Sequence, residues 1–336
     1  MKILIDAMGG DHAPEEILKG TAAAAREYDF TPVLVGDTEK IRRIVEECGI
    51  DLPEKTAYID AKTAVKMEDS PLAVRGTPDN SMRVGLCALR DGKGDAFVSA
   101  GNTGALQMGA NIFVHRIPGI TRPAIGTVLP LSCPVLLLDS GANATFSPEL
   151  LCQYALMGSV YMKKVRGVKK PRVGLLNIGS EPHKGTPDHA QAYALLCELA
   201  GVNFIGNVEP TALMNGACDV LVCDGFSGNI LLKTIEGMNA HIFSCIDRER
   251  AEAGEIGGEE PLLKVKKTFD PREYGGAPLI GVASPVIKAH GNSDARAFGN
   301  AIAQAILYAR GKVAKAIAKG LDGYDFSERK KQDQDV

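Results

Sequence analysis

The sequence contains no tryptophan, few other aromatic residues and no large excess of charge, and these shortages exclude one class of protein. Aromatic residues make up 5% of the 336 residues, and 38 basic side chains stand against 41 acidic ones, which gives a net charge of −3. A general nucleic-acid binder depends on basic side chains that neutralise phosphates and on aromatic rings that stack on bases. The sequence therefore predicts no nucleic-acid partner.

Long apolar runs are absent as well. The longest, such as Val135–Leu138, fall far short of the roughly 18 residues with which a helix crosses a bilayer. Asp6 interrupts what would be the apolar region of a signal peptide, so the first residues are expected to form a strand. No two of the eight cysteines form a C-x-x-C pair, and we interpret them as reduced, buried thiols. These features indicate a cytoplasmic protein.

The common catalytic motifs are also missing. No G-x-G-x-x-G follows a predicted strand, and no P-loop or H-E-x-x-H motif occurs, which weakens dehydrogenase, NTPase and zinc-hydrolase interpretations. Residues 225–228 stop one residue short of the G-x-S-x-G nucleophile elbow, so Ser227 is interpreted as a turn residue or a phosphate contact. Neither a metal nor a cofactor is predicted.

Short β-branched or leucine-rich runs alternate with longer helical patterns along the chain. This alternation is typical of parallel β-α-β units with helices on both faces of a sheet, and it predicts an α/β protein. A repeat of apolar residues from Phe298 to Ile317 predicts one helix with a buried apolar face. The ten predicted strands are Lys2–Ala7, Pro32–Gly36, Thr56–Ile59, Ala96–Ser99, Ile125–Leu129, Val135–Asp139, Arg172–Ile178, Asn203–Gly206, Val220–Asp224 and Pro278–Val282.

Two segments depart from this alternation. Residues 245–270 combine a charged, glycine-containing stretch with an apolar and basic one, and they are expected to project from the sheet. Residues 327–336 are polar and are expected to be disordered. Residues 1–325 are expected to form one catalytic unit of two α/β lobes, with the site in the cleft between the lobes.

Glycine is abundant, with 37 residues, and its positions are informative. Five loops that mix glycine with Asn, Ser, Thr or Asp each follow a predicted strand. Loops at the carboxyl ends of parallel strands converge on a crevice where ligands bind, and glycine lets backbone N–H groups approach an anion. One such loop is commonly an ordinary turn, whereas five together favour a phosphate-like ligand. The loops are residues 8–12, 99–104, 139–143, 177–186 and 224–229.

Four polar side chains in these and similar loops could act on a ligand. Lys184 precedes a predicted helix and could hold a phosphate or a developing oxyanion, although it could equally be a solvated surface lysine. Asn229 opens a helix, where its amide either caps the helix or orients a ligand oxygen. His12 and His290 are each either an acid or base or a hydrogen-bonded structural residue.

Taken together, these motifs resemble one family, the bacterial phosphate acyltransferases, which make acyl phosphate from acyl-acyl carrier protein and inorganic phosphate for phospholipid synthesis. The resemblance spans about residues 1–320, with the motifs in the expected order. The matching segments are residues 3–11, 99–105, 139–143, 177–181, 184–185, 224–229, 274–278 and 288–296.

The resemblance implies a fold, a mechanism and a set of site residues. The fold is a three-layer α/β/α arrangement similar to that of isocitrate and isopropylmalate dehydrogenases and of phosphotransacetylases, in a homodimer. Lys184 and Asn229 match positions central to substrate binding and catalysis, and no metal or nucleotide is required. Because bound phosphate is itself a nucleophile, we expect direct attack on the thioester, with Lys184 offsetting negative charge. The expected phosphate- and substrate-binding residues are Gly101, Asn102, Thr103, Gly104, Asn143, Ser180, Ser227, Gly228 and His290.

Partners follow from the same resemblance. An acidic acyl carrier protein needs a basic docking patch, for which residues 163–170 and 264–267 are candidates. In the family a basic, apolar hairpin provides peripheral membrane attachment. Here residues 248–260 are acidic and only residues 261–269 keep that character, so we expect weak membrane contact.

Two alternatives remain open. The first is a different enzyme on the same fold, either a phosphotransacetylase that uses acyl-coenzyme A or a decarboxylating dehydrogenase. The second is a non-catalytic protein that docks acyl carrier protein. The presence of Lys184, Asn229 and all five loops argues against a loss of chemistry.

Overall fold

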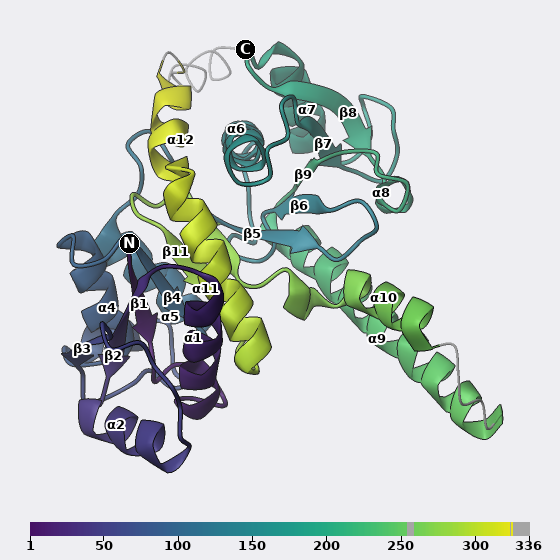
Figure 1. Ribbon diagram of the computed structural model, residues 1–336. Helices are drawn as coiled ribbons and strands as arrows, with labels where there is room; N and C mark the ends of the chain where they lie inside the picture. Colours follow the sequence, from purple (N-terminus) through teal and green to yellow (C-terminus); the bar gives the residue numbers. More distant parts are fainter. Residues whose placement is uncertain (254–258, 323, 325–336) are drawn as a thin grey trace.

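Short strands and helices alternate along the chain, and all the strands lie in one eleven-stranded sheet (Figure 1). The computed structural model describes residues 1–253, 259–322 and 324. Its strands are β1 (Lys2–Asp6), β2 (Thr31–Gly36), β3 (Ala57–Asp60), β4 (Ala96–Ser99), β5 (Ala124–Leu129), β6 (Val135–Leu138), β7 (Arg172–Leu176), β8 (Asn203–Val208), β9 (Val220–Val222), β10 (Ala277–Ile280) and β11 (Val286–Lys288).

The helices are mostly short, with one long exception, α9. They are α1 (Glu15–Glu27), α2 (Thr38–Glu47), α3 (Ala73–Gly76), α4 (Ser81–Arg90), α5 (Thr103–Gly109), α6 (Pro148–Val165), α7 (Pro187–Glu198), α8 (Pro210–Leu213), α9 (Gly225–Ala253), α10 (Glu259–Phe269), α11 (Ala295–Arg310) and α12 (Val313–Leu321). A π-helical turn η1 (Ala110–Val114) continues α5, and a 3₁₀ turn η2 (Pro271–Glu273) follows α10.

Central strands such as β1 bury side chains on both faces, which explains the continuous apolar runs in the sequence. In β1, Ile3 and Ile5 pack into a core shared with α1 and α11, whereas Leu4 packs into a second core shared with α4. The helices thus form a layer on each side of the sheet, and the predicted three-layer α/β/α architecture is confirmed (Figure 1).

The strand directions differ from the sequence-based expectation of a parallel sheet. The strand order is β3-β2-β1-β4-β11-β10-β5-β6-β9-β7-β8. The strands β3, β2, β1, β4 and β11 are parallel to one another, and so are β6, β9, β7 and β8, but the pairs β11–β10, β10–β5 and β5–β6 are antiparallel. The two parallel groups therefore run in opposite directions on either side of β10 and β5.

Ten of the strands match the ten predicted ones, β11 was not predicted, and one predicted helix is divided into two. The missed strand, β11, has only three residues, too few for a recognisable pattern. The helix predicted across Phe298 and Ile317 is two helices, because the chain turns at Gly311 and Lys312, and Lys312 has a left-handed φ of 50°. Phe298 and Ile317 are nevertheless fully buried, as the apolar repeat predicts.

The expectation that all the cysteines are buried is wrong. Cys152, Cys218 and Cys223 are buried, but Cys48 and Cys133 are exposed, as is Cys197. Cys48, for example, follows the last residue of α2 and is exposed together with its direct neighbours Glu47 and Gly49.

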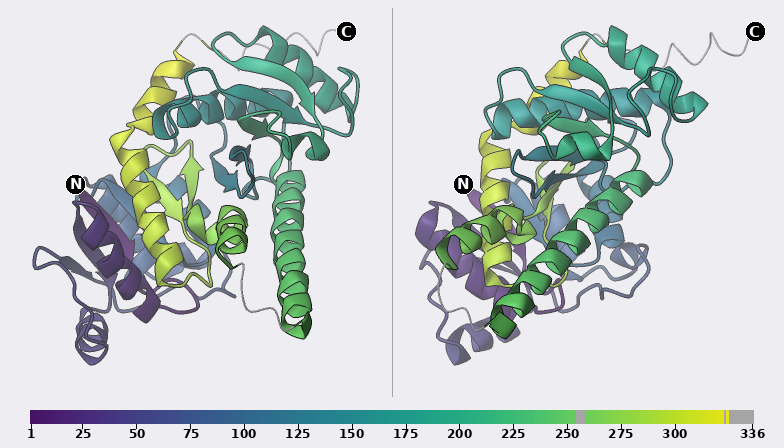
Figure 2. Two further views of the ribbon diagram at one scale, coloured as in Figure 1. Left: turned by 45° about the vertical axis from the view of Figure 1, so that its right-hand side comes forward. Right: turned by 90° about the vertical axis from the view of Figure 1, so that its right-hand side faces the viewer.

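The helices α9 and α10 extend side by side away from the sheet (Figures 1 and 2). Phe243 and Phe269 pack with ring centroids 6.3 Å apart, and Lys266 pairs with Asp247 across the two helices. Residues 254–258 and 327–336, which belong to the predicted projecting segment and the predicted tail, lie outside the described residues. Of the helices that the structure describes, none combines the length and the apolar character needed to cross a bilayer.

Candidate active site

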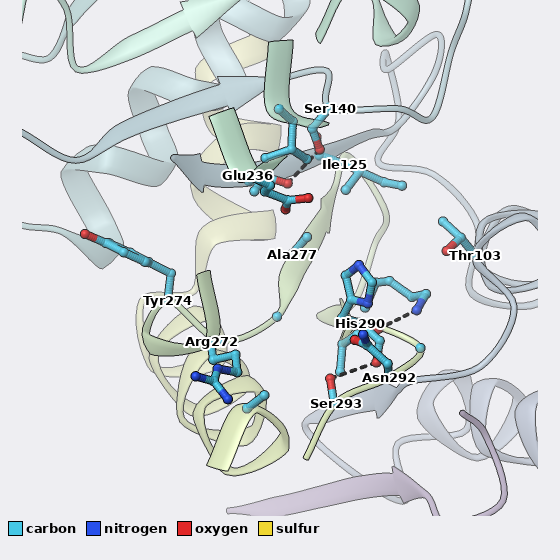
Figure 3. Close-up of a pocket in the computed structure, with 18 of the residues that line it drawn as sticks. Thr103, Ile125, Ser140, Glu236, Arg272, Tyr274, Ala277, His290, Asn292 and Ser293 are labelled. Atoms are coloured by element: carbon cyan, nitrogen blue, oxygen red, sulfur yellow. Dashed lines mark hydrogen bonds between the residues drawn. The ribbon is translucent and has the colours of Figure 1, made fainter. Parts of the chain in front are cut away.

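A cavity of about 940 Å³ lies where the two parallel groups of strands meet (Figure 3). The loops after β1, β4 and β11 line one side of it with Asp11, Thr103 and residues 288–294. The loop after β6 lines the other side with Ser140 and Gly141, and α9, which follows β9, adds Asn229. Figure 3 shows Ser140 opposite His290, with Ala277 of β10 between them. The cavity is therefore built from both halves of the molecule across the antiparallel centre of the sheet.

The loop after β4 directs most of its polar groups into the protein. Ser99 Oγ donates to Asp6 Oδ2 at 2.7 Å and accepts from the backbone N–H of Gly101 at 3.0 Å, while burial raises the pKa of Asp6. The carbonyl oxygen of the Asn102 side chain caps α5 through the N–H of Ala105. These contacts fix the start of α5.

The remaining groups of this loop divide between structure and cavity. The Asn102 side-chain amide donates to the carbonyl oxygens of Met67 and Asp69, each at 2.9 Å. A Cβ on Gly104 would lie 2.7 Å from Pro71 Cγ, so this glycine permits a close packing contact. Thr103, by contrast, is exposed and lines the cavity. Of the four residues predicted here, only Thr103 faces the cavity.

The loop after β6 is organised by one buried carboxylate, that of Asp139. It accepts the backbone N–H groups of Gly141, Ala142 and Asn143 at 2.8–2.9 Å, and burial raises the pKa of Asp139. The side-chain amide of Asn143 donates to Asp139 Oδ2 and to the hydroxyl of Tyr154, both at 2.9 Å. Asn143 thus holds the loop in place and does not line the cavity.

The predicted loop over residues 224–229 is helical from Gly225 onward, and this first turn of α9 packs against the loop after β6. Asp224 Oδ1 accepts the backbone N–H of Ser227 at 2.9 Å, and the N–H of Gly228 donates to the Asp224 carbonyl at 3.0 Å. A Cβ on Gly228 would lie only 1.9 Å from the Asp139 carbonyl oxygen, so glycine is required for this close approach. Neither Ser227 nor Gly228 lines the cavity.

Asn229, the next residue, does line the cavity. Its side-chain amide donates to the carbonyl oxygen of Ser140 at 3.1 Å, and Ser140 lines the cavity beside it. This hydrogen bond leaves the Asn229 side-chain carbonyl as an acceptor for a ligand. The structure thereby brings together three of the predicted residues, Thr103, Asn229 and His290, in one cavity.

The loop that carries Lys184 lies outside the wall of this cavity. The buried side chain of Asn177 donates to the Lys184 carbonyl at 2.9 Å and holds the loop. Lys184 itself is half-buried, and in the described part of the chain its Nζ has no ion-pair partner. Ser180 of the same loop lines a smaller cavity of about 340 Å³. His12 is exposed and, like Lys184, is not part of the larger cavity.

Lys288 lines the cavity but is not among the site residues predicted from the sequence. It ends β11, is 9% exposed and lines the cavity, and its Nζ donates to the carbonyl oxygens of Ala100 and Ala289. Burial lowers the pKa of Lys288 to about 8, against the opposing effect of Asp11 and Asp6. A lysine directly after the apolar pair Val286-Ile287 is the signal that could have identified it.

The other basic side chains of the cavity are neutralised by neighbours. Lys233 pairs with Glu236 at 2.7 Å, and Arg272 pairs with Asp270 at 2.8 Å. Within the described residues no carboxylate forms an ion pair with Lys288. No three His, Cys, Asp or Glu side chains are grouped as metal ligands in residues 1–253, 259–322 and 324.

The fold defines the class of protein first. A phosphotransacetylase from Streptococcus pyogenes superposes with a TM-score of 0.63 at 16% identity, over 94% of each chain. The EutD phosphotransacetylase from Staphylococcus aureus superposes with a TM-score of 0.57 at 15% identity, over 96% of this chain and 94% of the other. At such identities the similarity shows the fold alone, which is the phosphotransacetylase-type α/β fold.

Sequence comparison then gives the family. The family described as "Fatty acid synthesis protein" matches residues 1–316. The phosphate acyltransferase of Clostridium tetani is 42% identical over 329 residues, which cover 96% of this chain and 98% of the relative. That of Brevibacillus brevis is 44% identical over 337 residues, which cover 98% and 99%. The chain belongs to the phosphate acyltransferase family, and the prediction that it is an acyltransferase is confirmed.

Proposed function

We propose that the protein transfers a fatty acyl group from acyl-acyl carrier protein to inorganic phosphate, and that the acyl phosphate serves phosphatidic acid and membrane phospholipid synthesis. The observation that carries this proposal is the mixed lining of the larger cavity. Ile125, Val128 and Leu232 give it apolar surface for an acyl chain, whereas Thr103 and His290 give it polar groups for phosphate. Both substrates can therefore meet in one cavity.

The reaction needs positioning more than a protein nucleophile. Phosphate held beside the thioester attacks the carbonyl carbon directly, and the approach of two oriented reactants lowers the entropy cost of the step. Asn229 orients a substrate oxygen through the second N–H of its side-chain amide, the first N–H being donated to the Ser140 carbonyl. Lys184 offsets the charge of the tetrahedral intermediate. Because the loop that carries Lys184 follows β7, the strand next to β9, this loop has to move towards the cavity for the lysine to do so.

The test is phosphate-dependent formation of acyl phosphate, trapped with hydroxylamine as the acyl hydroxamate. Lys184→Ala and Asn229→Ala should each lower the rate by at least about a hundredfold, in line with the loss of an electrostatic contact to the transition state. Lys169→Ala, at an exposed lysine between α6 and β7, is the matched control and should keep the wild-type rate. Near wild-type activity of Lys184→Ala would refute its role, and hydroxamate formation without phosphate would refute the reaction.

The choice of acyl donor needs a separate comparison. Acyl-acyl carrier protein and acyl-coenzyme A with the same acyl chain should be compared by kcat/KM. A clear preference for acyl-coenzyme A would favour the phosphotransacetylase alternative. Binding of acyl carrier protein without any turnover of either donor would favour the non-catalytic docking protein.

Of the two basic patches, we propose residues 264–267 of α10 as the docking surface for acyl carrier protein. Asp270, Arg272 and Tyr274, just beyond α10, line the cavity, so a carrier bound there reaches it over a short distance. Residues 163–170 span the last turn of α6 and part of the connection to β7, at the end of the sheet opposite to the loop after β6 and the start of α9. A carrier bound at that edge would face away from the cavity.

A second copy of the chain and a membrane surface remain proposed partners of a cytoplasmic enzyme. The exposed apolar side chains of α9 and α10, among them Met238, Ile242 and Leu263, support a weak membrane contact. Co-sedimentation with anionic liposomes at low salt tests the membrane contact, and light scattering after gel filtration tests the dimer. A monomer, or no sedimentation, would refute the corresponding proposal.

A further inference from the structure

Lys288 lies where the neighbouring parallel strands β4 and β11 end and the segments that follow them begin to line the cavity. It pairs in register with Ser99, the last residue of β4, so the two strands end side by side. Two hydrogen bonds from its Nζ, to the carbonyl oxygens of Ala100 and Ala289, hold the buried side chain in one orientation. An ammonium group has three N–H donors, and the third has no acceptor among the described residues. Because Lys288 lines the cavity, that donor is available to a substrate.

Acidic side chains lie near Lys288, and those that the structure describes form no ion pair with it. Asp11, on the loop after β1, and Asp6, at the end of β1, are the charged groups that act on it, and neither is within ion-pair distance. His290, two residues further on, and Asp294, at the start of α11, are titratable groups that line the same cavity, whereas Ser99 of β4 and Ala277 of β10 are uncharged. Burial disfavours the ammonium and Asp11 and Asp6 favour it, so a pKa of about 8 lets Lys288 both give and regain a proton near neutral pH.

We propose that Lys288 is a catalytic residue that protonates the sulfur of the departing thiol. This role rests on the proposed acyl transfer. Cleavage of the thioester leaves a thiolate, whose thiol has an ordinary pKa near 8.5 for a simple alkyl thiol such as cysteine. A proton donor at the sulfur assists the departure of the thiolate.

The atoms and charges of this step balance. An oxygen of HPO₄²⁻ forms a bond to the thioester carbonyl carbon, the C–S bond breaks with its electron pair on sulfur, and the sulfur takes a proton from Lys288 Nζ. The acyl phosphate still carries the proton of HPO₄²⁻, which it then loses while the neutral amine regains one. In the net reaction the proton of the phosphate has moved to the thiol, and Lys288 is restored.

The experiment varies the leaving group. Two acyl thioesters with the same acyl chain are compared, one of pantetheine and one of 4-nitrothiophenol, whose thiolate leaves without protonation. Lys288→Met should lower kcat/KM for the pantetheine ester by about a hundredfold or more but for the nitrothiophenyl ester by less than about tenfold. Lys288→Arg should not restore the pantetheine reaction, because a guanidinium does not release its proton. Lys233→Met, at another cavity lysine, should affect both esters by the same factor.

The wild-type protein supplies a second measurement that does not depend on the folding of any variant. Its kcat/KM for the pantetheine ester should fall as the pH rises above about 8, whereas the nitrothiophenyl ester should lack this decline. Equal losses for both esters in Lys288→Met, or identical pH profiles in the wild type, would overturn the role of Lys288 and leave the acyl transfer intact. Absence of phosphate-dependent product with wild-type protein would refute the acyl transfer itself, and the role of Lys288 with it.

Discussion

Replacing Lys288 by methionine should remove a dependence of stability on pH that the buried amine creates. The pKa of Lys288 is about 8 in the folded protein and 10.5 without burial. Between these values the unfolded chain binds more protons than the folded one, so the free energy of unfolding rises with pH. Below pH 8 the burial of the ammonium costs its full amount, which for this shift is about 3 kcal/mol, and above 10.5 it costs nothing.

The assay is urea unfolding of the wild type and Lys288→Met at pH 7 and pH 9.5. Between these values the wild type should gain about 2 kcal/mol relative to the variant, because most of the cost of the buried ammonium disappears over this interval. Other titrating groups are present in both proteins and cancel in the difference. The absolute change also contains the two lost hydrogen bonds, so the pH dependence is the sharper measure.

The control is Lys169→Met, at an exposed lysine, whose stability difference from the wild type should be the same at both pH values. A pH-independent difference for Lys288→Met would refute the reasoning, since it would mean that Lys288 is as easily protonated in the folded protein as in the unfolded chain. A wild type that loses stability relative to the variant as the pH rises would show that an acidic neighbour, and not burial, governs Lys288.

Three further predictions concern the loops and the docking surface. Gly228→Ala should destabilise the protein by about 1–3 kcal/mol in thermal or urea unfolding, because its Cβ overlaps the Asp139 carbonyl. The control Gly237→Ala, in α9, should be neutral or slightly stabilising, because a Cβ there meets nothing within 4 Å. Asp139→Asn should cost about 2 kcal/mol of unfolding free energy, because an amide places N–H donors against the backbone N–H groups that Asp139 accepts; an unchanged midpoint would contradict this. The double variant Lys264→Glu and Lys267→Glu should raise KM for acyl-acyl carrier protein about tenfold but leave KM for a small thioester unchanged. The control Lys169→Glu with Lys170→Glu should change neither KM. The opposite pattern would place the docking surface at residues 163–170.

The strands were predictable because each is short, apolar and bounded by polar loops, and their pattern survives in a sheet buried on both faces. Their directions were not, because an apolar run reads the same whichever way the strand is paired. The antiparallel centre formed by β10 and β5 is set by contacts between segments that lie far apart in the sequence. The three residues of β11 are too few to give any periodicity.

The candidate site shows a similar division. The positions of the glycine-rich segments after the strands were predictable, although residues 225–229 begin α9 and do not form a loop, and Thr103, Asn229 and His290 do line one cavity. The hydrogen-bond partners of the backbone N–H groups were not predictable. The N–H groups of Gly101 and residues 141–143 donate to Ser99 and Asp139 inside the protein and not to a ligand. Lys288 was overlooked because a lysine is usually exposed, and only the folded structure shows that its amine is enclosed by two carbonyls.

The position of β11 between β4 and β10 has a consequence for synthesis of the chain. Lys288 meets the Ala100 carbonyl across 188 residues, so the edge of β4 stays unpaired until the later segment has been made. At 5–20 residues per second this takes about 10–40 s on the ribosome. During that time an apolar strand edge is open to pairing with other nascent chains. The arrangement that assembles the cavity from distant segments thus also makes the N-terminal half dependent on its own C-terminal strand for protection against aggregation.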